Sequence, residues 1–90
     1  METDWALVGR RVARLRQQQG IDRRALAERA SIPYFNVKMI ERGAGLSLRD
    51  DVEAVAVALG TDNAELTKPK GGQADEPTPD EAGLVSGVGD

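Results

Sequence analysis

Arginine and lysine are the side chains of this sequence most able to do chemistry, and they are concentrated in one stretch. Residues 8–49 hold ten cationic side chains against three acidic ones, a net charge of +7. Residues 71–90 hold five acidic side chains and no cationic one, a net charge of −5. A basic body followed by an acidic segment indicates that the body binds a polyanion, although a solvated, arginine-rich helical surface would give the same pattern.

Catalytic and metal-binding chemistry has little support in the composition. The 90 residues contain no His and no Cys, which removes the commonest general base, the commonest transition-metal ligand and any disulfide. Asp50, Asp51 and Glu53 are close in sequence, but stabilisation of a helix N-terminus explains them better than a metal does. We therefore expect a protein that is not an enzyme and that uses no cofactor or metal.

Membrane and export signals are not visible either. No apolar run approaches the length of a membrane span, and no secretory signal pattern opens the chain. The expectation is a cytoplasmic protein without a membrane partner.

Apolar side chains recur every three or four residues in five segments, the spacing of an amphipathic helix. Thr3, Asp22, Ser47 and Asp62 precede four of these segments, where such side chains accept hydrogen bonds from the first helical turn. Pro33 suits the start of the remaining one, because proline has no N–H to leave unpaired. The expected helices are residues 4–19, 22–30, 33–42, 47–59 and 62–66, which predicts an all-α, compact five-helix domain.

The composition changes after residue 68. Residues 69–90 are rich in Gly, Pro and acidic side chains and contain no aromatic residue. Such a segment cannot bury enough apolar surface to offset the loss of chain entropy on folding. We expect a folded domain at residues 1–68 and a disordered acidic C-terminal tail at residues 69–90.

Several short motifs follow one another along residues 7–66. They are Gly9, Arg11-Val12, Leu15-Arg16, Gly20-Ile21, Ala25-Leu26-Ala27, Ile40-Glu41-Arg42-Gly43, Ala58-Leu59-Gly60 and Glu65-Leu66. In this order they resemble the phage-repressor-like (Xre/Cro-type) helix-turn-helix family of DNA-binding domains. The resemblance implies that residues 22–30 and 33–42 form the helix-turn-helix and that the second of these helices enters the major groove of DNA.

The resemblance also implies roles for individual residues. It places Pro33, Tyr34, Phe35 and Lys38 against base edges, Arg23 and Arg42 against the DNA backbone, and Arg16 beside Glu41 in a buried ion pair. The residue types add two candidates: Asn36, whose amide can pair with adenine, and Arg24, which shares with Arg23 a helix N-terminus that attracts anions. Tyr34 and Phe35 are neighbours and cannot both face inward, so one of them should be exposed.

The expected function is a sequence-specific DNA-binding transcriptional regulator, such as a phage or prophage repressor or a Cro-like protein. One such module buries little surface on double-stranded DNA, so we expect a homodimer on DNA, with its contact around Trp5, Leu46, Leu59 and Leu66. The alternative is an antitoxin that neutralises a protein partner through its acidic tail and autoregulates by operator binding. Loss of a co-purifying partner on deletion of residues 69–90 would favour the antitoxin.

Overall fold

The computed structural model describes residues 3–69, which form α-helices and one short 3-10 helix without strands. This confirms the predicted all-α, five-helix fold. The predicted acidic tail lies outside the described residues except for Pro69. Among the described helices, none has the length and apolar character needed to cross a membrane. The elements are α1 (Trp5–Gln18), α2 (Arg23–Ala30), α3 (Tyr34–Glu41), η1 (Gly45–Leu48), α4 (Arg49–Ala58) and α5 (Asn63–Thr67).

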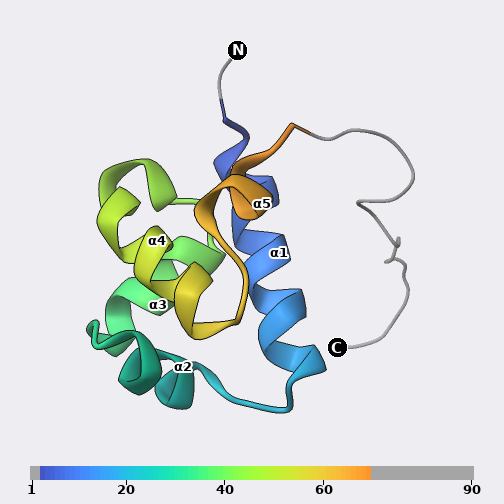
Figure 1. Cartoon of the computed structure of the whole chain (residues 1–90). Helices are drawn as coiled ribbons and strands as arrows, with labels where there is room; N and C mark the ends of the chain where they lie inside the picture. Colours follow the sequence, from blue (N-terminus) through green and yellow to red (C-terminus); the bar gives the residue numbers. More distant parts are fainter. Residues whose placement is uncertain (1–2, 70–90) are drawn as a thin grey trace.

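Figure 1 shows the helices packed around one another. Their inward-facing apolar side chains form one core. The longest helix, α1, contacts α3, η1 and α5, while α2 packs on both α3 and α4. Each helix contributes the stripe that its apolar spacing predicted, so the core draws on every α-helix. The buried residues of this core cluster are Val8, Val12, Leu26, Ala27, Val37, Ile40, Val52, Val55, Ala56, Leu59 and Leu66.

Short acidic side chains begin three of the helices. The carboxylate of Asp22 accepts from the backbone N–H of Ala25 at 2.8 Å, and that of Asp62 accepts from the N–H of Glu65 at 2.8 Å, as predicted. At α1, Asp4 rather than Thr3 is the cap, and it accepts from the N–H of Leu7 at 3.1 Å. The prediction of Thr3 was wrong because Asp4 has the extended backbone and the side-chain reach that a cap requires.

The start of α4 also differs from the prediction. Ser47 does not cap it: residues Gly45–Leu48 form η1, and α4 begins at Arg49 after Leu48, without a side-chain cap. Gly45 is buried against Trp5, since a Cβ at this glycine would lie 2.6 Å from Cε3 of the indole. Leu48 packs against the core from the end of the same turn. Both anchors draw the chain inward over the residues that the sequence indicated as a loop.

The turn between α2 and α3 closes tightly. Ser31 has a left-handed backbone, with φ 59° and ψ 43°, a conformation more often taken by glycine. The N–H of the next residue, Ile32, donates to the carbonyl of Ala27 at 3.0 Å, and the Ile32 side chain packs against the core. This closure holds α2 and α3 as one helix-turn-helix unit.

Arg11 fastens α5 onto α1. Its guanidinium is nearly buried, and Nη1 donates to the carbonyl oxygens of Leu66 at 3.0 Å and Lys68 at 2.7 Å. These carbonyls lie at the end of α5, where helix carbonyls lack partners within the helix. The sequence did not predict this role, because it joins residues more than fifty positions apart.

Candidate nucleic-acid interface

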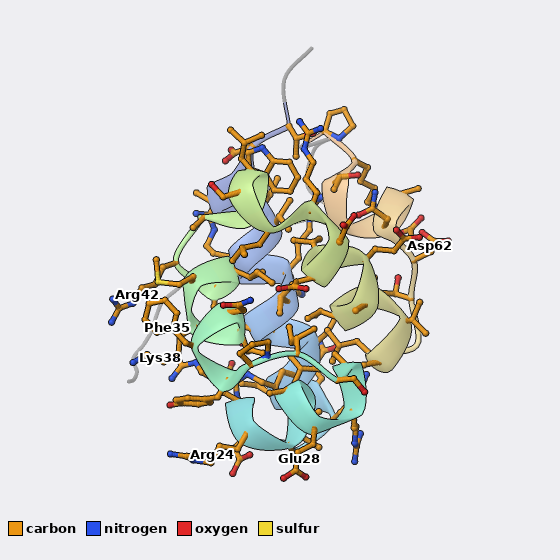
Figure 2. The ribbon with its side chains drawn as sticks, turned by 90° about the vertical axis from the view of Figure 1, so that its left-hand side faces the viewer. Arg24, Glu28, Phe35, Lys38, Arg42 and Asp62 are labelled. Atoms are coloured by element: carbon orange, nitrogen blue, oxygen red, sulfur yellow. The ribbon has the colours of Figure 1, made fainter. Side chains whose placement is uncertain are left out.

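One side of α3 faces away from the core. Val37 and Ile40 are fully buried, so the residues on the opposite side of the helix point outward. Phe35 is 61% exposed and Arg42 is exposed, while Lys38 and Met39 are half-buried. Figure 2 shows that Phe35, Lys38 and Arg42 project from the same side of this helix. We call this set the outward stripe of α3: Phe35, Lys38, Met39 and Arg42, spaced as i, i+3, i+4 and i+7.

The two neighbouring aromatic residues have different surroundings. Tyr34 is half-buried and packs against the core, whereas Phe35 is the exposed one of the pair, as the sequence required of one of them. The guanidinium carbon of Arg24 lies 4.5 Å from the centroid of the Tyr34 ring, and Nζ of Lys38 lies 5.7 Å from it. Cations over an aromatic face are attracted by its quadrupole. The Tyr34 ring therefore holds a cation from α2 and one from α3 at the same edge of the molecule.

Asn36 is tied to α4. Its Nδ2 donates to Oδ2 of Asp51 at 2.6 Å, and the Asn36 side chain is half-buried. A primary amide has two N–H donors and a carbonyl acceptor, so this contact leaves further hydrogen-bonding capacity on the amide. Asp51 thus fixes the orientation of a side chain that the sequence indicated for base contact. Nothing local in the sequence marks this pair, since Asp51 lies fifteen residues further along the chain on another helix.

A buried carboxylate joins three helices beneath this surface. The side chain of Glu41 is 4% exposed, and it accepts from Nε of Arg16 at 2.7 Å and from Nε of Arg23 at 2.9 Å. Arg16 is the partner that the family resemblance implied for Glu41, whereas Arg23 was expected only at DNA. The hydrogen bond from Arg23 to Glu41, followed by the charge of Glu41, raises the pKa of Arg23. Because its partners come from α1 and α2, Glu41 fixes the end of α3 relative to both of them.

The start of α2 forms a cationic hollow of about 190 Å³. Arg23 and Arg24 are the first two residues of α2, and the N–H groups of a first turn point out of the helix toward any anion placed there. The hollow is therefore suited to a phosphate oxygen. Its lining consists of Arg16, Asp22, Arg23, Arg24 and Tyr34.

An arginine lies at each end of this surface. Figure 2 shows Arg42, the last residue of the outward stripe, at one end and Arg24 of α2 at the other, with Phe35 and Lys38 between them. Pro33 is exposed at the start of α3, where it provides no side-chain cap. Among the residues that the sequence singled out for base and backbone contact, this face brings together Arg23, Arg24, Tyr34, Phe35, Lys38 and Arg42. Asn36 is instead turned toward α4 by its hydrogen bond to Asp51.

The described part of the chain contains no cluster of potential metal ligands. No group of three or more acidic residues there is arranged to hold a metal ion. The acidic residues at the start of α4, Asp50 and Asp51, lie in its first turn, where they complement the helix dipole.

Comparison with known proteins places this face in context. The family model described as "Helix-turn-helix domain" matches residues 7–68, which is more than half of the chain. No curated protein and no solved structure matches the chain. The matched range begins at the third residue of α1 and ends just after α5, so it covers the helical domain except the start of α1, and it includes the face described above. The chain belongs to the helix-turn-helix domain family, and its fold is that of a DNA-binding regulator.

Proposed function

We propose that this protein is a sequence-specific transcriptional regulator, acting in the cytoplasm as a phage or prophage repressor or a Cro-like protein. Residues 33–42 would lie in the major groove of its operator, which is wide enough to admit an α-helix. The observation that carries the proposal is the outward stripe of α3, which turns the exposed side chains of Phe35 and Arg42 away from the core and has Arg24 of α2 beside its other end.

Base readout falls first to the outward stripe. Lys38 can donate to guanine O6 and N7, and the exposed ring of Phe35 can contact a thymine methyl group. Pro33, Tyr34 and Asn36 stand at the start of the same helix and complete the set of base-contact candidates. None of these candidates is a glutamine that could pair with adenine through two hydrogen bonds, so the sequence specificity would rest on these few contacts and on DNA shape.

Backbone contacts would come from Arg23, Arg24 and Arg42. Arg23 keeps part of its guanidinium for DNA, because its side chain is 45% exposed while only Nε is engaged by Glu41. These arginines would set the register of α3 in the groove without reading sequence.

Selection of bound sites from random duplexes, at one stated salt concentration, tests the proposal. The wild-type protein should enrich a short DNA sequence motif. Phe35→Ala should change the preferred base at one position, because it removes the contact with the thymine methyl group. The matched control is Asn63→Ala, an exposed neutral residue of α5 that lies outside the outward stripe and outside the proposed dimer contact, and it should leave the preferred bases unchanged. Enrichment of no motif by the wild-type protein would reject sequence-specific binding.

The contact surface predicted for the homodimer has to be corrected. Leu59 and Leu66, which the sequence indicated for the dimer contact, are 4% and 1% exposed, because both fill the core. Among residues 3–69, the large apolar residues that are exposed away from α3 are Leu46 at 56% and Val57 at 70%. We place the homodimer contact at these two residues, with half-sites one helical turn of DNA apart. Sedimentation of the protein on a selected full site measures this, and a single copy per site would contradict it.

A further inference from the structure

A second cationic hollow lies where α1, α2 and α3 meet. Its volume is about 200 Å³, which leaves room for a phosphate group and several waters, each of which takes about 30 Å³ in the liquid. Four of its six lining side chains are cationic and one is acidic. The lining residues are Arg10, Ala13, Arg23, Lys38, Glu41 and Arg42.

The single acidic side chain does not neutralise this hollow. The Glu41 carboxylate is 4% exposed and is already engaged by Arg16 and Arg23. Within residues 3–69, no ion pair joins a carboxylate to Arg10, Lys38 or Arg42. Three positive charges therefore remain without a carboxylate partner around one concavity, and a concavity lined by one sign of charge concentrates the field that attracts anions.

The close approach of α1 to α3 brings Arg10 into this hollow. At the neighbouring Gly9, an added Cβ would lie 2.5 Å from the carbonyl oxygen of Ile40 and 2.6 Å from that of Glu41. Only a glycine allows the two backbones to come this near. Arg10, the next residue on α1, thereby lines the same hollow as Arg42, which ends α3.

We infer that this hollow binds a backbone phosphate of the DNA duplex and that Arg10 is its contact from α1. The inference rests on the proposed function, because Lys38 and Arg42 belong both to the hollow and to the outward stripe of α3. The mouth of the hollow thus borders the face that meets DNA. Guanidinium groups offer paired N–H donors that match phosphate oxygens, and here two of them come from different helices. The bound phosphate extends the protein's footprint beyond the C-terminal end of α3.

The salt dependence of binding measures this contact. The assay is titration of a selected operator duplex at several salt concentrations, with Arg10→Ala, Arg42→Ala and the double variant. Each neutralised phosphate contributes about 0.9 to the slope of log affinity against log salt. Because the two arginines share one phosphate, the double variant should lower the slope by about 0.9 rather than by about 1.8. Arg10→Ala alone should weaken binding several-fold without changing the preferred bases.

Arg29→Ala is the matched control. Arg29 is exposed near the end of α2 and lines neither cationic hollow, so its loss removes the same charge without changing the slope. An Arg10→Ala affinity equal to that of the wild type would overturn the inference while leaving the proposed function intact. A loss of about 1.8 in the double variant would also overturn it, because each arginine would then hold its own phosphate. No duplex binding by the wild-type protein would instead reject the proposed function.

Titration with inorganic phosphate separates a DNA contact from a site for free anions. The probe is the NMR signal of the side-chain Nε–H groups of Arg10 and Arg42 in the protein without DNA. If these signals shift at millimolar phosphate while Arg10→Ala leaves the DNA affinity unchanged, the hollow is a free-anion site and the inference fails. Weaker DNA binding by Arg10→Ala, together with signals of Arg10 and Arg42 that shift both with the operator duplex and with inorganic phosphate, supports the phosphate of the duplex.

Discussion

Gly9→Ala tests how closely α1 and α3 approach. The added Cβ would lie 2.5 Å and 2.6 Å from two carbonyl oxygens of α3, whereas ordinary contacts lie at 3.4–4 Å. The helices would have to separate by about 0.9 Å, the difference between 3.4 Å and 2.5 Å. Both obstacles are backbone atoms, so no side-chain rotation can relieve the overlap.

Two opposing effects decide the outcome of Gly9→Ala. Alanine is favoured over glycine within a helix by about 0.5–1 kcal/mol. Against this, overpacking costs about 1–3 kcal/mol, and a gap of about 0.5–1 Å loses a quarter to a half of the dispersion energy across the opened contact. Val37 and Ile40 of α3 pack fully buried in the core that this separation would open. We expect a net loss of about 1–2 kcal/mol in the free energy of unfolding, and a fall in Tm of about 4–8 °C for each kcal/mol.

Thermal and urea unfolding, followed by circular dichroism, measure the loss. The neighbouring exposed position supplies the control: Arg10→Ala and Arg10→Gly report the helix propensity of the same turn without any overlap. At position 10 alanine should be the more stable residue, whereas at position 9 glycine should be. If Gly9→Ala were as stable as the wild type, the close approach would not constrain the fold, and the reasoning that brings Arg10 beside Arg42 would be refuted.

Three further substitutions test the contacts that hold the helices together. Glu41→Gln should lower the free energy of unfolding by about 3 kcal/mol, because it leaves a buried arginine without its charge partner; Arg23→Met, at a partly exposed site, should cost less than about 1 kcal/mol. Urea unfolding compares them, and equal losses would contradict the buried position of the carboxylate. Arg11→Met should cost about 1–3 kcal/mol by leaving the carbonyl of Leu66 unpaired. Hydrogen exchange should then become faster in α5 than in α1, and unchanged exchange in α5 would count against this role of Arg11.

Much of the fold follows from interactions within one or two helical turns. Helix spacing identified the buried stripes, and the side chains of Asp22 and Asp62 cap the helices that they precede. Such contacts join residues three or four positions apart, so the sequence alone carries the information. The prediction that Ser47 caps α4 was wrong, because the packing of Gly45 and Leu48 draws that segment into a 3-10 turn and outweighs the capping tendency of the serine.

The composition and motif order of the chain were enough to establish an all-α, helix-turn-helix domain with a basic face. They could not tell that Phe35 rather than Tyr34 is exposed, or that Asn36 binds Asp51, because these outcomes depend on how α3 is rotated against α2 and α4. The meeting of Arg10, Lys38 and Arg42 has the same origin: residues about thirty positions apart become neighbours only when α1 and α3 pack together. Charge clusters of this kind arise from packing between helices, so the spacing of residues within a single helix cannot predict them.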